Sequence, residues 1–328
     1  MNHRQRVGSI FPAHDRTAWI TVQRPPRPMA RDPFKPHAFF LEEERAGSGQ
    51  VVSSATILLT NKECPWRCLM CDLWKNTTTQ TVPVGAIPRQ IDHALAQLRS
   101  RPEQIKLYNS GSFFDPAAIP PVDYPAIART VAFAKHVVVE SHPRLVGERA
   151  LRFRDLLSGS LEVAMGLETV HPQVLPRLNK KFELGHFSQA AAFLRTHGIS
   201  VRAFVLVKPP FLDEEEGLEW AVKSVAFALS CGATVVSLIP TRPGNGALER
   251  LMAAGEFSPP RLTTLEKALE LALDVRGDGR IFADTWDSEQ FSRCPACFEK
   301  RRQRIHAMNL SQRIQPAIDC PTCGLKTG

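Results

Sequence analysis

The sequence has no apolar run that approaches the roughly 18 residues needed to span a bilayer. Residues 1–7 carry positive charge, but no continuous apolar core follows them, so the start lacks the pattern of a secretory signal. No Gly-x-Gly-x-x-Gly segment follows the first predicted strand, which speaks against a dinucleotide-binding fold. These absences predict a cytoplasmic protein without a membrane segment.

Cysteine is scarce in the centre of the chain. Of the eight cysteines, Cys231 alone lies between residues 72 and 293, and the others form two tight groups at 64–71 and 294–323. Paired cysteines of small secreted proteins form a disulfide framework, whereas tight clusters in a reducing compartment are typical of metal sites. The two groups therefore predict metal binding, and Cys231 is interpreted as an inert core thiol at a helix end.

The chain has 328 residues, 43% of them hydrophobic, which is enough for one large α/β domain with a small appendage or for two ordinary domains. Its net charge of +8 comes from the two ends, since residues 1–36 hold seven Lys/Arg against two Asp/Glu and residues 294–328 hold six against two. This distribution predicts that the ends contact tRNA or another polyanionic partner. The alternative for residues 298–306 is a solvated basic helix.

Apolar periodicity indicates strands that alternate with helices from residue 51 onward. The predicted strands are 55–60, 105–108, 136–140, 161–167, 201–207, 234–239 and 281–284, and the predicted helices are 87–98, 124–135, 144–157, 186–197, 214–230 and 261–274. Such an alternation predicts a parallel sheet with helical crossovers, either open or partly closed into a barrel. We expect three units: a basic N-terminal extension over 1–50, the α/β domain over 51–290 and a metal-binding tail over 291–328.

Cys64, Cys68 and Cys71 follow the first predicted strand directly, with the spacing Cys-x3-Cys-x2-Cys. Three thiolates suit a [4Fe–4S] cluster, in which they bind three irons and leave the fourth iron without a protein ligand. An open metal position is typical of a site that performs chemistry, whereas a structural site is closed. A zinc site that takes its fourth ligand elsewhere and an electron-carrier cluster are the alternatives.

In the loop after the first strand of a βα series, this cysteine motif resembles the radical S-adenosylmethionine (SAM) superfamily. Met70 stands where many members have an aromatic residue, and Trp66 and Trp74 are near enough to shield the cluster. Further motifs end the successive strands: Asn109-Ser-Gly-Ser, Glu140-Ser-His-Pro, Gly166-Leu-Glu-Thr with Leu178-Asn-Lys, Val207-Lys-Pro-Pro and Ile239-Pro-Thr. In this order they resemble the radical SAM subunit of archaeosine synthase, a relative of the radical SAM domain of the Elongator catalytic subunit, over roughly residues 51–325.

The resemblance implies a partial (β/α)6 TIM-type barrel that holds SAM across the C-terminal ends of its strands. It also implies reductive cleavage of SAM to a 5′-deoxyadenosyl radical, with a reductase or ferredoxin-like electron donor. The implied substrate is a tRNA nucleoside, a 7-deazaguanine lysine adduct that is converted by carbon–nitrogen cleavage. Radical chemistry on a small molecule or natural-product intermediate is the alternative, and a non-enzymatic Fe–S or zinc-ribbon nucleic-acid-binding protein is a third.

The strand-end motifs supply the candidate SAM-binding residues. We expect the turn formed by Ser110, Gly111 and Ser112 to bring its backbone close to the amino or carboxylate group of SAM. Glu140 and Glu168 could accept hydrogen bonds from ribose hydroxyls or the SAM ammonium, and Lys208 could hold a carboxylate. The alternatives are salt bridges for the glutamates and a capped loop lysine for Lys208.

Further polar residues of the same loops are weaker candidates. Asn179 and Lys180 could also contact SAM or the substrate, while His142 and His186 are candidate acid/base groups that are more often structural.

The tail carries Cys294, Cys297, Cys320 and Cys323 as two Cys-x2-Cys pairs separated by 22 residues. Two such pairs are typical of a closed tetrahedral thiolate site with structural zinc. An auxiliary Fe–S cluster and unmetallated cysteines are the alternatives.

Overall fold

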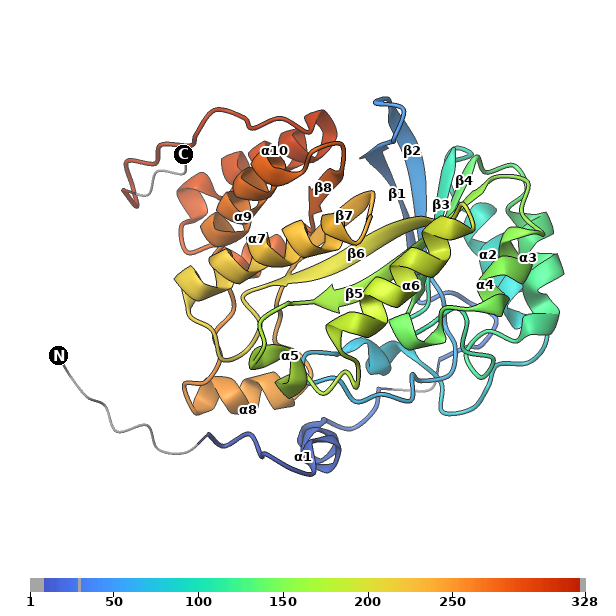
Figure 1. The fold of residues 1–328 in the computed structure, drawn as a ribbon, viewed down its shortest axis with the longest axis horizontal. Coiled ribbons are helices and arrows are strands. Elements are labelled where there is room, and N and C mark those ends of the chain that lie inside the picture. The colour runs from blue at the N-terminus through green and yellow to red at the C-terminus, as the bar shows by residue number, and fades with distance from the viewer. Residues whose placement is uncertain (1–8, 29–30, 325–328) are drawn as a thin grey trace.

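The protein folds around one curved eight-stranded sheet in which the strands follow each other in chain order (Figure 1). The computed structural model describes residues 9–28 and 31–324; residues 1–8 and 29–30 of the predicted extension and 325–328 of the predicted tail lie outside the described residues. The strands are β1 Ala38–Arg45, β2 Val51–Leu58, β3 Gln104–Tyr108, β4 His136–Ser141, β5 Ser160–Glu168, β6 Ser200–Val207, β7 Val235–Pro240 and β8 Arg280–Ala283. β1 is antiparallel to β2, and every later neighbour pair is parallel.

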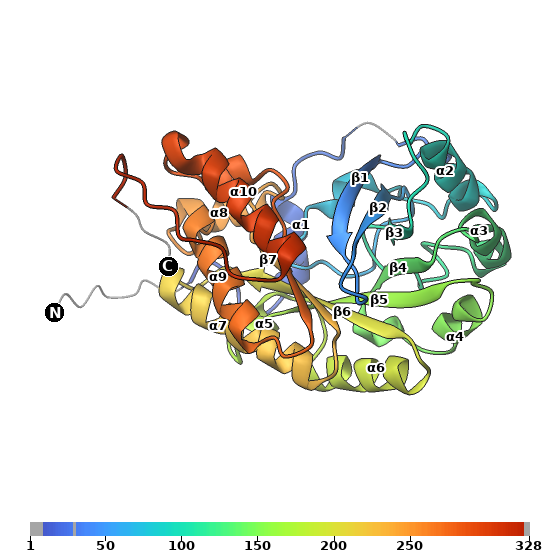
Figure 2. The ribbon, with the colours of Figure 1, turned by 90° about the horizontal axis from the view of Figure 1, so that it is seen from above.

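Helices connect the parallel strands as the sequence predicts. They are α1 Arg16–Gln23, α2 Ala86–Leu95, α3 Tyr124–Thr130, α4 Glu148–Arg154, α5 Val174–Arg177, α6 Leu184–Thr196, α7 Glu214–Ser230, α8 Ala247–Ala253, α9 Leu262–Val275 and α10 Pro295–Ser311, with short 3-10 turns η1 Leu73–Asn76, η2 Pro121–Asp123, η3 Pro143–Leu145 and η4 Ser288–Phe291. Seen from above, the strands follow an arc with helices along its outer side (Figure 2). Across the described ranges, no helix combines the length and the apolarity that crossing a bilayer requires. The predicted partial barrel is confirmed.

The edge strand β1 was not predicted. It lies inside the segment 1–50 that the sequence assigned to an extension, because its second half, Glu42-Glu-Glu-Arg45, has the charge of a solvated segment. Two of these charges, Glu42 and Glu44, are paired instead. Glu44 is buried, and Glu42 receives a hydrogen bond from Thr56 of the neighbouring strand.

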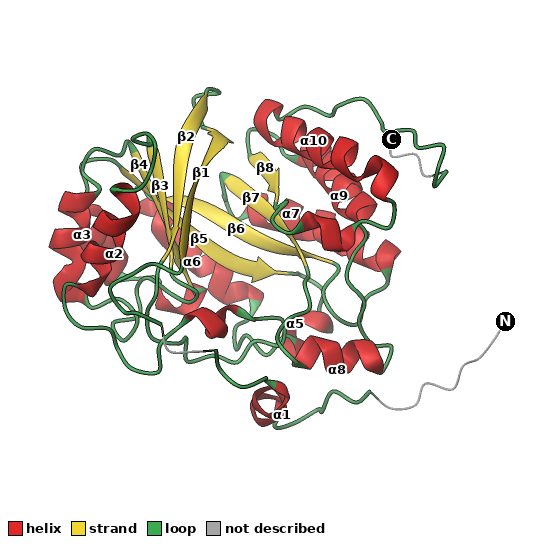
Figure 3. Ribbon diagram, turned by 180° about the vertical axis from the view of Figure 1, so that it is seen from behind, coloured by secondary structure: helices red, strands yellow, loops and turns green. Residues whose placement is uncertain are grey.

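The two faces of the sheet differ in chemistry. Side chains such as Ile105 and Leu107 on β3 and Val163 on β5 point outward into the main hydrophobic core beneath the helices. The residues that alternate with them, among them Lys106 on β3 and Glu162 on β5, point to the concave face, as period-two alternation requires. In Figure 3 the helices α2 and α3 lie at the left end of the arc of strands, and α9 and α10 lie at its right end.

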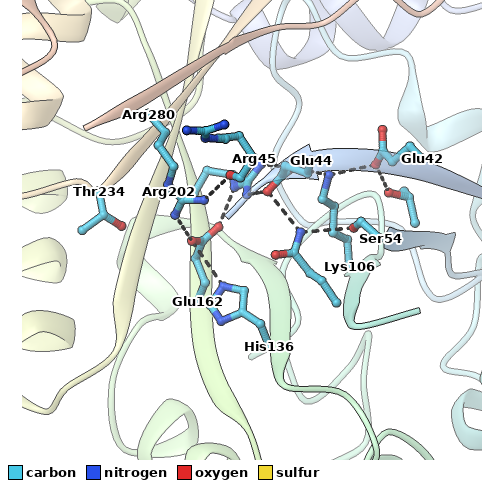
Figure 4. A network of polar contacts seen from close by, with 12 residues as sticks. Glu42, Glu44, Arg45, Ser54, Lys106, His136, Glu162, Arg202, Thr234 and Arg280 are labelled. Carbon is cyan, nitrogen blue, oxygen red and sulfur yellow. Dashed lines mark hydrogen bonds and ion pairs between the residues drawn. The ribbon is translucent and has the colours of Figure 1, made fainter. Parts of the chain in front are cut away.

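A buried ion network fills the concave face near the start of the parallel strands (Figure 4). Arg202 on β6 contacts Glu162 on β5 and Glu44 on β1, each at 2.6 Å, and Lys106 on β3 also contacts Glu44. Burial alone would raise the pKa of Glu162, but the charges of Arg202 and His136 hold it at about 2. Since β1 and β6 are not neighbours in the sheet, this network holds the sheet in its curled form.

The free edge of β8 is covered by side-chain amides of α10. Asn309 accepts a hydrogen bond from the backbone N–H of Ala283 and donates one to its C=O, both at 2.9 Å. Gln312 does the same with Ile281, at 2.8 Å in each direction. The two amides satisfy the groups that a ninth strand would pair with, so this edge is closed to further strand addition.

Replacing Asn309 with Ala should lower the free energy of unfolding by about 2 kcal/mol, because it leaves a buried N–H and a buried C=O of Ala283 without partners. Chemical denaturation of the purified protein measures this loss. Gln303→Ala removes an exposed amide from the same helix and should change the stability little. Equal stability of the two variants would contradict the edge-capping role.

Candidate active site

The loop that carries Cys64, Cys68 and Cys71 is fixed by loops that follow two other strands. The backbone N–H of Leu69 donates to the carbonyl of Leu178 at 2.9 Å, and the Asn179 amide donates to the carbonyl of Arg67 at 2.7 Å, both from the region after β5. After β7, the amide of Asn245 donates to the carbonyl of Leu69 at 2.6 Å. These contacts hold the cysteine loop at the C-terminal ends of the strands, where the sequence predicted it.

The N-terminal segment covers the outside of the cysteine loop. Arg24 and Arg27 both form ion pairs with Glu63, which directly precedes Cys64. Their guanidinium groups also lie over the ring of Trp74, at 4.7 and 5.5 Å from its centroid. These two arginines are therefore committed within the protein. The contact of the basic N-terminal end with a polyanion stays a prediction, and these ion pairs show what holds the two arginines in this structure.

The three thiols of the loop lie in a poorly solvated environment. Burial, the largest cause, raises the pKa of Cys64 to about 11 and that of Cys71 to about 12, and it raises the pKa of Cys68 further still. The negative charges of neighbouring thiolates act in the same direction on Cys68 and Cys71. Thiolates at these positions therefore need a bound cation, which the irons of a cluster supply.

The predicted turn at 110–112 lies directly against the cysteine loop. A Cβ atom on Gly111 would stand 3.4 Å from the Cβ of Cys64, and Ser110 adopts a left-handed backbone with φ 55°. The backbone N–H groups of Asn109 and Gly111 both donate to the carboxylate of Glu140 at the end of β4. Glu140 therefore supports this turn, and a direct contact of Glu140 with SAM stays a prediction.

The environment of Glu140 perturbs its protonation. Burial raises its pKa to about 7, although the N–H groups of residues 109–111 act in the opposite direction. The carboxyl group is thus poised between its two forms near neutral pH, at the base of the turn that faces Cys64.

Glu168 and Lys180 form a buried ion pair beside the thiols. Burial alone would lower the pKa of Lys180, but Glu168 and the thiolates of Cys68 and Cys64 raise it, so the amine stays charged. Gly166 makes room for this pair, because a Cβ at that position would collide with both charged groups. The structure thus brings two candidate residues together next to the cysteine loop.

The remaining candidates lie in hydrogen-bonded positions. Ser112 pairs with the hydroxyl of Ser141 at 2.8 Å, and both are buried. The amine of Lys208 donates to the carbonyl and to the hydroxyl of Ser258, each at 2.6 Å, and lies 3.8 Å from Glu214. This is the capped loop lysine that the sequence left as its alternative, and the structure does not bring it to the thiols.

Both candidate histidines have structural roles. The His142 ring stacks on Trp66 of the cysteine loop, with 3.8 Å between ring centroids, and its Nε2 lies 3.0 Å from the carbonyl of Lys180. Burial lowers the pKa of His142 to about 3, so the ring is neutral at physiological pH. The ring of His186 accepts the backbone N–H of Glu183 at the start of α6.

The sequence did not single out the side chain of Asn109, which follows β3. It is fully buried, yet within residues 9–28 and 31–324 neither its amide nitrogen nor its carbonyl oxygen finds a hydrogen-bond partner. A buried unpaired amide costs about 1–3 kcal/mol, so native structures seldom keep one without a partner. Its amide lies 3.9 Å from the position of a Cβ on Gly111, the residue that faces Cys64. The three cysteine thiols and this unpaired amide therefore fit a ligand that places a polar group beside the thiols.

Within the described ranges, the one group of metal-ligand side chains whose ligand atoms all lie within 4.8 Å of one another is Cys294, Cys297, Cys320 and Cys323. That spacing suits ligands that share a single ion. The thiolates of a [4Fe–4S] cluster bind different irons and are spaced more widely, so the loop cysteines need not meet the same condition. The four tail cysteines were predicted to converge in this way.

In the helix between the two tail pairs, Arg302 is exposed and pairs with Glu299, but two of the arginines expected on its basic face are buried. Arg301 and Arg304 are only 1% and 5% exposed, and both form ion pairs with Glu266 on α9. Arg301 also donates to the sulfur of Cys297 at 3.3 Å, and Arg304 contacts Glu270. The prediction that these arginines grip phosphates is wrong, because their charge fastens α10 and the tail to the barrel.

Comparison with known proteins identifies relatives over about two thirds or more of the chain. The chain is 25% identical to archaeosine synthase subunit beta from Methanosarcina acetivorans over 249 residues, 72% of each chain. It is 28% identical to the subunit of the same name from Thermococcus kodakarensis over 225 residues, 66% of this chain and 69% of that protein. No family model matches the sequence.

Two solved structures overlap with part of the fold. Queuine lyase from Clostridium spiroforme, bound to SAM and queuine, gives a TM-score of 0.44 at 16% identity over 60% of this chain and 78% of that one. Methylornithine synthase gives a TM-score of 0.48 at 13% identity, over 68% of this chain and 63% of that one. The curated relatives and the cysteine motif together support a relationship to the radical SAM superfamily of enzymes, as the sequence predicted.

The support that Glu140 gives to the turn is testable through pH. Its folded pKa of about 7 lies above the ordinary glutamate value of 4.5, so folding favours the protonated form, and its contribution to stability is lost as pH rises between these values. Wild-type protein should therefore lose up to about 3 kcal/mol of unfolding free energy over this range through this group. Glu140→Gln cannot titrate and should show a flatter profile in urea unfolding at pH 5 and pH 7.5.

Glu148→Gln, an exposed glutamate in the helix that follows β4, is the matched control and should keep the wild-type profile. If Glu140→Gln and wild type have the same pH dependence, Glu140 does not titrate as its burial requires.

Proposed function

We propose that this protein binds a [4Fe–4S] cluster through Cys64, Cys68 and Cys71, cleaves SAM reductively and modifies a nucleoside in tRNA. The observation that carries the proposal is the cysteine loop itself. It is held at the C-terminal ends of the strands, its three thiols are desolvated, and Cys64 lies against a turn that contains an unpaired buried amide. When bound, the cluster supplies the electron that breaks a sulfur–carbon bond of SAM to give a 5′-deoxyadenosyl radical.

The residues around the thiols have roles that follow from their contacts. Gly111 allows the turn to approach Cys64, and the Asn109 amide offers a donor and an acceptor to a polar group of SAM. Lys180 and Glu168 place a positive and a negative charge beside the thiols. Two tryptophan rings shield the loop from water: Trp66 stacks on His142, and Trp74 lies beneath the guanidinium of Arg24. Lys208 remains a candidate for an anionic group only if its contact with Ser258 opens.

The substrate proposal rests on the curated relatives, which are named archaeosine synthase subunit beta. We take the reaction to be carbon–nitrogen cleavage of a 7-deazaguanine lysine adduct in tRNA, which begins with hydrogen abstraction from the carbon next to nitrogen. A reductase or ferredoxin-like protein would deliver the electron. A cytoplasmic location belongs to the same proposal, since tRNA and reduced thiols coexist there.

The test incubates the anaerobically reconstituted protein with SAM, dithionite and tRNA that carries the lysine adduct, followed by mass spectrometry of the nucleosides. We expect 5′-deoxyadenosine together with loss of the adduct. Cys68→Ala should abolish both, whereas Cys231→Ala should preserve both, because Cys231 lies outside the two cysteine groups.

Normal turnover by Cys68→Ala would refute the cluster assignment. Formation of 5′-deoxyadenosine without any change in the tRNA would instead favour a small-molecule substrate.

For the tail we propose a structural zinc ion bound by Cys294, Cys297, Cys320 and Cys323. The four sulfurs come from the start of α10 and from a loop after it, and they offer a closed, single-ion site. Arg301 donates to Cys297, which favours the thiolate form that zinc requires. The ion would thus join the chain end to the helix that covers the edge of β8.

Metal analysis tests this proposal. A variant with Cys64, Cys68 and Cys71 all changed to Ala should retain about one zinc per chain and little iron. Changing Cys320 to Ser in that background should release the zinc and destabilise α10, since metal binding supplies folding energy to such small units. Retention of about four irons by the triple variant would show an auxiliary Fe–S cluster in the tail instead.

A further inference from the structure

The ion pairs of Arg24 and Arg27 and the burial of Arg301 and Arg304 leave open where a polyanion contacts this protein. A pocket of about 230 Å³ is lined by Arg144, Arg149 and Arg152, with Glu148 as the one acidic residue of its lining. Its residues come from η3 and α4, which follow β4. The pocket therefore has a net positive charge and opens at the same edge of the sheet as the predicted chemistry.

Three contacts tie this pocket to the loops around the thiols. The ring of His142, two residues before Arg144, stacks on Trp66 of the cysteine loop. Arg144 donates to the carbonyl of Lys181 at 3.1 Å, next to the lysine that pairs with Glu168. Arg149 donates to the carbonyl of Phe114 at 2.8 Å, in the loop that continues from the turn at 110–112. The pocket thus lies between the loops that follow β3 and β5.

Arg144 and Arg149 are held by backbone carbonyls, which do not neutralise their charge. Across residues 9–28 and 31–324, neither Arg144, Arg149 nor Arg152 forms an ion pair with a carboxylate, in contrast to Arg24, Arg202 and Arg301. The carbonyl contacts of Arg144 and Arg149 use one N–H each and leave further donors available. Arg149 and Arg152 are three residues apart on α4 and so share one face. A guanidinium fork matches two oxygens of a phosphate.

We propose that this pocket binds a phosphodiester group of the polynucleotide substrate, close to the nucleotide whose base enters the active site. The inference rests on the proposed function and adds the surface through which the nucleic acid is held. Contacts to phosphates set the register of a nucleic acid without reading its sequence. They also offset the cost, about a few kcal/mol, of extruding a base from its stack.

The experiment measures the affinity of the reconstituted full-length protein for unfractionated tRNA over a series of KCl concentrations. The double variant Arg144→Gln/Arg152→Gln should bind about tenfold more weakly at a given salt concentration, since each arginine loses a charged hydrogen bond. The slope of log K against log[KCl] should become shallower by about 0.7 to 0.9 for each lost phosphate contact. Arg152→Lys should recover part of the affinity, because it keeps the charge without the fork.

The matched control is Arg99→Gln/Lys135→Gln. It removes the same charge from exposed positions just before β3 and β4, at the opposite end of the sheet. The control should bind tRNA as the wild type does. Iron content and SAM cleavage without substrate should be unchanged in both double variants, since none of these residues contacts the cysteine loop directly.

The outcomes separate this proposal from the one on which it rests. If wild type binds tRNA with a steep salt dependence and the pocket variant matches the control variant, the pocket assignment is overturned. If the wild type itself shows no salt-dependent tRNA binding beyond that of an unrelated protein of equal pI, the proposal that tRNA is the substrate is refuted, and the pocket assignment that rests on it is refuted as well.

Discussion

Arg202 reaches across the concave face of the sheet, from β6 to Glu44 on β1, and contacts Glu162 on the way. Breaking a buried ion pair of this kind leaves an uncompensated charge, which lowers the stability of the fold. Because β1 and β6 are not neighbours in the sheet, the pair can form only when the sheet is curled. The curl decides the rest of the structure, because it turns the C-terminal ends of the parallel strands toward one another. Loops that are 109 and 176 residues from the cysteine loop along the chain then meet it, as the contacts of Leu178 and Asn245 with Leu69 show.

The two ends of the curled sheet are chemically distinct. Near the start of the strands, Lys106 and Arg202 are paired with Glu44 and Glu162. At the other end the structure keeps groups that folding alone does not satisfy: thiols with raised pKa values, the unpaired amide of Asn109 and arginines without acidic partners. Such a division is expected of an enzyme, where unsatisfied polar groups gather where ligands bind.

The sequence predicted most of the fold and the two cysteine groups, since alternating apolar segments and cysteine spacing are local signals. It did not predict β1, because the charges of Glu42 and Glu44 indicate a solvated segment until their partners on β2, β3 and β6 are known. The burial of Arg301 and Arg304 was missed for the same reason, as Glu266 and Glu270 lie far away in the chain. The hydrogen bond from Asn245 to the cysteine loop and the unpaired amide of Asn109 likewise arise only in the folded state, where the strand ends are brought together.

The central claim is that the three loop thiols leave one iron open for SAM. The most direct measurement is the electron paramagnetic resonance spectrum of the dithionite-reduced, reconstituted protein, with and without SAM labelled with ¹⁵N or ¹⁷O in its amino acid group. The account predicts about four irons per cluster at this site, a changed spectrum on SAM addition and hyperfine coupling to the labelled atoms. A reduced cluster whose spectrum does not change on addition of SAM and shows no hyperfine coupling to the labelled atoms would contradict this claim.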